Sequence, residues 1–319
     1  MVTSSQSSYQ EILAKAWQQH LAPREPDAPT VISLFAGAGG SSLGYSMAGY
    51  RELLAVEWDA NAVETFKLNF PDVPVYHGDI AKLSVEEVLQ RTGLQPGELD
   101  VLDGSPPCQG FSTAGKRDMA DDRNQLFREY VRLLRGLRPK VFVMENVSGM
   151  VKGKMKLIFV EILKELKASG YKVSVRLMNA MYFHVPQSRQ RLIFIGVRED
   201  VEGAPEHPKA EGWGMDGSKV VPELQDKRFV SWRNAGQRDT VRPRGACPVG
   251  IAKDGIPLEG RIKYIDPEGI KLFFSFPPQW RLVGKEQEKR DRLGNSVPPL
   301  LIRSVASHLR KCVLDGASP

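Results

Sequence analysis

The chain has 319 residues, of which 41% are hydrophobic and 26% are charged, with 29 Gly and 22 Pro. This composition is typical of a folded protein and excludes wholesale disorder and a fibrous structure. Three widely spaced cysteines cannot form a disulfide framework or a structural zinc site, and no apolar run is long enough to span a membrane. The N-terminus has no secretory signal, so we expect a cytoplasmic protein, and the cysteine spacing leads us to expect no metal. The net charge of +6 fits a polyanionic partner.

Residues 1–29 are expected to form an N-terminal extension with a short helix over residues 9–21. Leu13, Ala16 and Trp17, together with Ile12, share one face of this helix, which favours docking onto the main body. A frayed tail is the alternative.

From Thr30 onward, short apolar runs rich in β-branched residues alternate with segments of helical periodicity. Strands are expected at 30–35, 52–56, 100–104, 140–146, 171–178 and 191–197, and helices at 41–49, 59–69, 84–91, 124–137 and 155–168. This alternation predicts an α/β fold in which a doubly wound, mostly parallel sheet has helices on both faces.

The pattern changes after the last of these strands. Residues 199–263 are rich in Gly, Pro and charge, and 227–263 hold nine bases against three acids. A segment compatible with a helix returns at 298–311, with prolines at its start. We therefore expect a sheet domain at 30–198, an irregular insertion at 199–263, and a C-terminal part at 264–319 that returns to the sheet domain.

A glycine-rich turn, FAGAGGSSLGY, follows the first expected strand. Gly37, Gly39 and Gly40 allow the backbone to approach a ligand closely. Glu57 lies 20 residues beyond Gly37 at the end of the second strand, where an acid holds a ribose hydroxyl in nucleotide sites.

The turn lacks the spacing of dinucleotide sites, because Ser42 occupies the position of the last glycine. This disfavours an NAD-dependent dehydrogenase and favours an adenosine ligand without a pyrophosphate, such as S-adenosylmethionine. Trp58 would stack on the adenine, and Asp79, in HGDI after the next strand, would accept from its amino group. A structural turn flanked by ordinary surface acids is the alternative.

Two reactive side chains follow neighbouring strands. Paired prolines stiffen the chain before Cys108 and hold its thiol at the carboxyl end of the expected sheet, where open α/β sheets bind ligands. A single cysteine is otherwise more often a small buried hydrophobe. Glu145 emerges at the same edge in MENV, and a carboxyl at a buried strand end favours a functional role over a satisfied structural one.

Two further motifs carry polar groups. In QSRQR, alternation places Arg189 and Arg191 on one face of a strand, which suggests recognition of an anion or a carbonyl oxygen; a surface strand edged with charge is the alternative. In GNSVPP, Asn295 and Ser296 precede a helix, so this turn would close over a polar ligand or serve as a simple cap.

Taken in order, FAGAGG, VEWD, HGDI, GSPPCQGFS, DDRNQLF, ENV, QSRQR and GNSVPP closely resemble the motifs of the cytosine-C5 DNA methyltransferases. The resemblance covers about residues 30–197 and 264–311. It implies a class I, Rossmann-like methyltransferase core, S-adenosylmethionine as donor with S-adenosylhomocysteine as product, and a target-recognition region at 199–263. It also implies that double-stranded DNA is methylated by base flipping, in a restriction–modification system or by an enzyme that stands alone.

The resemblance also assigns roles. Cys108 would be the nucleophile that adds to C6 of cytosine, and Glu145 the acid at N3 and the amino group. Arg191 would hold the cytosine O2 with support from Arg189, and residues 109–122 resemble the loop that closes on DNA. The residues implied to line the cofactor site are Phe35, Gly37, Ala38, Gly39, Gly40, Glu57, Trp58, Asp79, Ile80, Pro107, Leu126, Asn295 and Ser296.

The sequence departs from the family in its short insertion and at Glu268 and Gly269, which replace an Arg-Glu pair. Both departures concern how the rest of the protein holds the recognition region in place. Two alternatives are a tRNA cytosine-5 methyltransferase of the same family and a non-catalytic DNA-binding relative. We expect a bacterial monomer, because an enzyme that acts on one strand at a time needs no dimer, with a cognate restriction endonuclease as a candidate partner.

Overall fold

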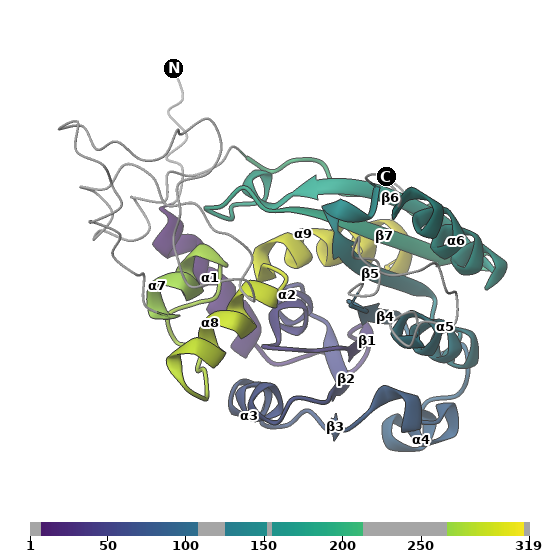
Figure 1. Ribbon diagram of the computed structural model, residues 1–319, viewed down its shortest axis with the longest axis horizontal. Helices are drawn as coiled ribbons and strands as arrows, with labels where there is room; N and C mark the ends of the chain where they lie inside the picture. Colours follow the sequence, from purple (N-terminus) through teal and green to yellow (C-terminus); the bar gives the residue numbers. More distant parts are fainter. Residues whose placement is uncertain (1–7, 108–124, 152–154, 213–266, 316–319) are drawn as a thin grey trace.

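The computed structural model describes residues 8–107, 125–151, 155–212 and 267–315. Their strands form one sheet in the order β3-β2-β1-β4-β5-β7-β6 (Figure 1). Only β7 runs antiparallel to its neighbours, so the sheet is mostly parallel, as predicted. The strands are β1 (Thr30–Leu34), β2 (Arg51–Glu57), β3 (Val75–His77), β4 (Val101–Gly104), β5 (Val141–Val147), β6 (Tyr171–Asn179) and β7 (Gln190–Arg198).

Helices cover both faces of the sheet (Figure 1). Residues alternate in direction along a strand, so in β1 Val31 joins one core while Ile32 and Leu34 join the other. The first core contains residues of α1 (Tyr9–Leu21), α2 (Gly40–Met47), α3 (Ala60–Asn69), α7 (Pro267–Phe273), α8 (Glu286–Asn295) and α9 (Pro299–Leu309). The second contains residues of α4 (Val85–Thr92), α5 (Gln125–Leu137) and α6 (Met155–Ala168).

The close contact between α2 and α9 depends on two glycines. A Cβ atom at Gly44 would lie 2.6 Å from the Cβ of Ile302 and 2.7 Å from the carbonyl oxygen of Pro299, and one at Gly40 would collide with the carbonyl oxygen of Val297. Only glycine permits this approach. The C-terminal helix α9 therefore packs beside the glycine-rich turn, and the residues that precede α9 in the chain lie at that turn as well.

The expected helices and strands are present, with ends that differ by at most two residues. The helix at 9–21 has the predicted bounds and is docked, with Leu13 and Ala16 fully buried, so the frayed tail is excluded for this segment. The sequence analysis missed α7 and α8. Only Leu293 among the residues of α8 is a large apolar side chain, so this helix shows no hydrophobic periodicity.

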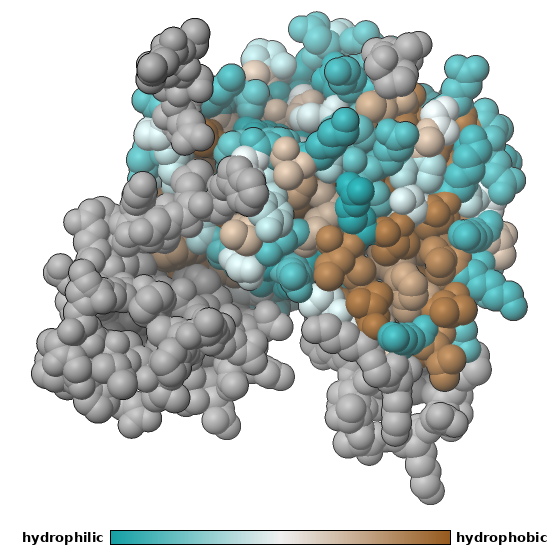
Figure 2. Space-filling view, turned by 90° about the horizontal axis from the view of Figure 1, so that it is seen from above, coloured by the Kyte–Doolittle hydropathy of each residue, from teal (hydrophilic) through white to brown (hydrophobic). Residues whose placement is uncertain are grey.

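Hydrophobic side chains gather on part of the face shown in Figure 2. On α6, Ile162 and Leu166 are buried against the sheet, whereas Leu157 and Val160 are exposed, as is Leu177 on β6. The helix is therefore apolar on more than one side. None of the helices within the described ranges has the length and hydropathy needed to span a bilayer.

Candidate functional site

The predicted site residues cluster at the carboxyl edge of the parallel strands. The glycine-rich turn follows β1, Glu57 ends β2, Asp79 follows β3, and Glu145 lies near the end of β5. Open α/β sheets bind ligands at this edge. Cys108, the loop at 109–122 and the basic stretch at 227–263 lie outside the described residues.

The turn after β1 is held in an unusual backbone conformation. Phe35 has a φ of 59°, and Gly37 and Gly39 have φ of 54° and 80°. A non-glycine residue in this region is strained, and such strain is typical of ligand sites. Behind the turn, a Cβ atom at Gly39 would lie 3.1 Å from the Trp280 ring, so this side is packed. At Gly37 the nearest atom among the described residues would be the Phe35 carbonyl oxygen at 3.9 Å, an ordinary van der Waals distance, so this position is not crowded.

Glu57 organises the turn through backbone donors. Its Oε2 accepts from the amide of Gly37 at 2.7 Å, and its Oε1 accepts from Trp58 at 2.8 Å and Asp59 at 2.9 Å. A carboxylate has about four acceptor positions, so Oε2 keeps one for a ligand. The Trp58 side chain is 79% exposed beside it, as a platform for a planar ring would be.

Asp79 lies next to Glu57, because the amide of Gly78 donates to the carbonyl of Glu57 at 3.0 Å. Its Oδ1 accepts from the amide of Ala81 at 3.0 Å and caps a short helix that starts at the buried Ile80. The structure therefore brings Glu57, Trp58 and Asp79 together, as the sequence predicted.

The GNSVPP turn borders the glycine-rich turn from the other side. The carbonyl oxygen of Val297 contacts Gly40 so closely that no Cβ fits between them. Ser296 is buried and its Oγ donates to the carbonyl of Arg292 at 2.8 Å, whereas Asn295 is exposed. Of the remaining predicted lining residues, Ala38 is buried, Pro107 is exposed, and Leu126 packs against the second core from the first turn of α5.

Glu145 and Arg191 form a buried ion pair. Their side chains lie on neighbouring strands β5 and β7, with 2.5 Å between Arg191 Nε and Glu145 Oε1. Each residue is only 8% exposed. Buried charges are stable only when paired, so this contact holds both groups in place.

Arg189 lies just before β7, which begins at Gln190, and points to the GNSVPP turn. Its Nη2 donates to the carbonyl oxygens of Gly294 at 2.8 Å and Ser296 at 3.0 Å, and the guanidinium lies 5.0 Å from the centre of the Phe274 ring. Burial, followed by repulsion from Arg191, lowers the pKa of Arg189 to about 9. Both arginines are buried, so the alternative of a surface strand edged with charge is wrong.

Asn146 fixes the chain that leads to Cys108. Its Nδ2 donates to the carbonyl oxygen of Pro106 at 3.2 Å, and its own Oδ1 accepts from the amide of Val147 at 2.8 Å. The end of β5 therefore supports the proline pair after β4.

A buried acidic cluster beneath the turn was missed by the sequence analysis. Asp103 on β4 is 3% exposed and accepts from the hydroxyl of Tyr45 at 3.3 Å, and burial raises its pKa to about 7. Burial likewise raises the pKa of Glu52 on β2 to about 8, partly offset by the hydroxyls of Ser33 and Ser42. A register shift between β1 and β2 turns the Glu52 side chain toward this buried cluster, and no sequence pattern signals such a shift.

Comparison with known proteins places this geometry in context. Residues 29–243 match the C-5 cytosine-specific DNA methylase family. Type II methyltransferase M1.HphI of Haemophilus parahaemolyticus is 32% identical over 327 residues, covering 88% of this chain and 87% of that protein. Type II methyltransferase M.Sau96I of Staphylococcus aureus is 30% identical over 336 residues, covering 88% and 75%. The crystal structure of the S. pombe Dnmt2 methyltransferase shares the fold, with a TM-score of 0.64 at 20% identity over 88% of this chain and 98% of that one.

Proposed function

The chain belongs to the C-5 cytosine-specific DNA methylases, and from this membership and the geometry of the site we propose how its residues act. It is an enzyme, a DNA cytosine-5 methyltransferase, so the non-catalytic alternative is wrong, and the family match to DNA methylases favours DNA over tRNA. The family implies S-adenosylmethionine, which supplies an electrophilic methyl group on a sulfonium when bound.

The carboxyl edge of β1, β2 and β3 fits this donor. The spare acceptor position on Glu57 would take a ribose hydroxyl, and the exposed Trp58 ring would stack on the adenine, with Asp79 accepting from its amino group. Gly37 has no side chain and is not crowded by the described residues, which allows close approach of the ligand to its backbone. The other residues proposed to line this site are Phe35, Ala38, Gly39, Gly40, Ile80, Pro107, Leu126, Asn295 and Ser296.

Cys108 is the proposed nucleophile. C5 of cytosine is too weakly nucleophilic to attack a methyl group, so the thiolate adds to C6 and pushes an electron pair toward C5. C5 then takes the methyl group, and loss of the C5 proton expels the thiolate and restores the aromatic ring. Because C5 and C6 are stacked in a duplex, the base must first be flipped out of the helix, which costs a few kcal/mol.

Glu145 and Arg191 would bind the flipped base. A proton or a strong hydrogen bond at N3 accepts the charge that develops when C6 is attacked, and Glu145 provides it. Its contact with Arg191 holds the carboxyl group in position for N3. Arg191 then remains to donate to the cytosine O2, while Arg189 holds the neighbouring turn through Gly294 and Ser296.

The remaining parts of the proposal concern DNA and partners. The basic residues in the target-recognition region, 199–263, would contact phosphates and help offset the cost of flipping. Residues 30–198 and 264–319 would form the catalytic domain, with 1–29 as an N-terminal extension. We propose that the enzyme acts as a monomer in the cytoplasm, on chromosomal DNA. The Type II names of its bacterial relatives support a cognate restriction endonuclease as a candidate partner.

The observation that carries this proposal is the buried Glu145–Arg191 pair at the sheet edge that also holds the Glu57-supported glycine turn. Its test is incubation of the protein with labelled S-adenosylmethionine and unmethylated duplex DNA, with tRNA as a parallel substrate. We expect 5-methylcytosine in the DNA. Label in tRNA alone, or in neither substrate, would contradict the proposal.

A further inference from the structure

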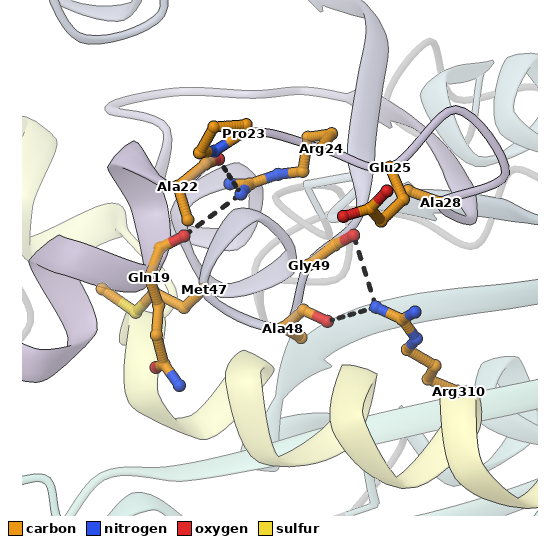
Figure 3. Close-up of a pocket in the computed structure, with 10 residues that line it drawn as sticks. All are labelled: Gln19, Ala22, Pro23, Arg24, Glu25, Ala28, Met47, Ala48, Gly49 and Arg310. Atoms are coloured by element: carbon orange, nitrogen blue, oxygen red, sulfur yellow. Dashed lines mark hydrogen bonds between the residues drawn. The ribbon is translucent and has the colours of Figure 1, made fainter.

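The N-terminal helix α1 connects two parts of the molecule that are far apart in sequence. Its C-terminal end is joined to α2, the helix that follows the glycine-rich turn. His20 Nδ1 lies 2.8 Å from the Ser46 hydroxyl, and Arg24 donates to the carbonyls of Ser46 at 2.9 Å and Tyr50 at 3.0 Å. Figure 3 shows Arg24 at this junction, where it also binds the carbonyls of Gln19 and Ala22.

The N-terminal end of α1 is joined to α7, beside which it lies in Figure 1. The hydroxyl of Tyr9 donates to the carbonyl oxygen of Leu272 at 2.5 Å, and the Tyr9 side chain is buried. The first turn of α1 is well formed, because the Ser8 side chain accepts from the amide of Glu11 and the Glu11 carboxylate accepts from the amide of Ser8. Tyr9 is therefore held by a capped helix that is itself anchored at its far end.

Consecutive residues at the end of α7 are held from different directions. Tyr9 binds the carbonyl of Leu272, the Gln187 side chain donates to the carbonyl of Phe273 at 2.7 Å, and the Arg189 guanidinium packs on the Phe274 ring. Gln187 and Arg189 belong to the loop that leads into the strand of Arg191. The end of α7 is thus shared by the N-terminal helix and the proposed cytosine site.

α7 begins at Pro267 and is the first described element after the proposed recognition region, so it is the C-terminal attachment of that region. Glu268, one of the two residues that replace the family's Arg-Glu pair, takes part in the support of this helix. Lys271 is buried, pairs with Glu268, and donates to the carbonyls of Pro278 at 2.7 Å and Trp280 at 2.8 Å. This contact ties α7 to the chain that follows it, and Tyr9 ties it to the N-terminal helix.

We propose that Tyr9 is a positioning residue for DNA, which through Leu272 holds the attachment of the recognition region in register with the cytosine-binding arginines. The inference rests on the proposed function. Within the described part of the chain, the Tyr9 hydroxyl makes a single hydrogen bond, so its loss should loosen α7 without removing the packing of the ring.

The test compares Tyr9→Phe with Tyr171→Phe. Tyr171 is a matched control, because its hydroxyl also donates to a backbone carbonyl, that of Pro139 at 2.8 Å, and its side chain belongs to the second core whereas α7 packs in the first. For each variant we would measure the KM for unmethylated plasmid DNA, the Kd for S-adenosylmethionine, kcat, and hydrogen exchange of the amides in α7.

Tyr9→Phe should raise the KM for DNA by at most about fivefold, the value of one net hydrogen bond, and speed exchange in α7, with little change in kcat or in the Kd for S-adenosylmethionine. Tyr171→Phe should lower the stability of the fold and leave the KM for DNA, kcat and the Kd for S-adenosylmethionine unchanged. A second variant, Ser8→Ala, removes the side-chain cap of α1 and should shift the KM in the same direction.

If Tyr9→Phe leaves the KM for DNA at the value of Tyr171→Phe, the role of Tyr9 is purely structural and the inference is wrong, even if exchange in α7 increases. Absence of DNA methylation by the unmodified enzyme is a different result, because it would contradict the proposed function itself.

Discussion

The Nε atom of Arg191 lies 2.5 Å from Oε1 of Glu145, between two strands that run in opposite directions. Antiparallel pairing of β7 with β5 is what allows this contact, since it carries Arg191 to the edge where the parallel strands end. The pair is buried, so each charge depends on the other. A cytosine that enters the site meets a carboxyl group and a guanidinium whose positions are already set.

Glu145→Gln should reduce kcat by roughly 10²- to 10⁴-fold, because the amide cannot supply the proton at N3. The Kd for S-adenosylmethionine should change little, and the melting temperature should fall because Arg191 loses its buried counter-ion. Glu165→Gln is the matched control. It removes an exposed ion pair, with Arg135 at 2.8 Å, and should leave both kcat and stability nearly unchanged. A variant Glu145→Gln with normal turnover would remove Glu145 from the mechanism.

Glu57→Gln should weaken S-adenosylmethionine binding by about tenfold or more, since the amide nitrogen cannot accept from the backbone donors or from a ribose. Isothermal titration of the cofactor would measure the change. Glu64→Gln, on the exposed face of α3, is the control. Equal affinities in the two variants would mean that the cofactor does not contact Glu57.

Glu52 should make the protein less stable in alkali. Burial raises its pKa from 4.5 to about 8, so the buried form is neutral below that value. Its contribution to stability is fully present below about pH 4.5 and is lost as the pH rises through about 8, a change on the order of 5 kcal/mol. Glu52→Gln should remove most of this decline in urea unfolding between pH 5 and pH 9. An unchanged pH profile would show that Glu52 is not the group responsible.

Gly44→Ala should destabilise the fold by about 1–3 kcal/mol, because the added methyl group would overlap Ile302 on α9. Gly149→Ala serves as the comparison, since a Cβ atom there has no neighbour within 4 Å. Denaturant unfolding of the two variants gives the difference. If Gly44→Ala unfolds at the same denaturant concentration as Gly149→Ala, the helix contact is not tight in solution.

Hydrophobic periodicity was enough to predict the sheet and most helices, because buried strands and amphipathic helices have distinct repeats. The grouping of Glu57, Trp58 and Asp79 followed from the rule that parallel strands end at one edge. The inward position of Glu52 did not follow, since it depends on a register shift. The partners of Arg189 and Tyr9 were also hidden, because Ser296 and Leu272 lie more than a hundred residues away in the chain.

The role of Cys108 is tested most directly by covalent capture on duplex DNA that contains 5-fluorocytosine at the methylated position. Fluorine cannot leave C5 as a proton does, so the enzyme should remain bonded to C6 after methyl transfer. The unmodified protein should form a complex that survives denaturing electrophoresis, and Cys108→Ser should form none while retaining its affinity for S-adenosylmethionine. Capture that persists in Cys108→Ser would contradict the central claim.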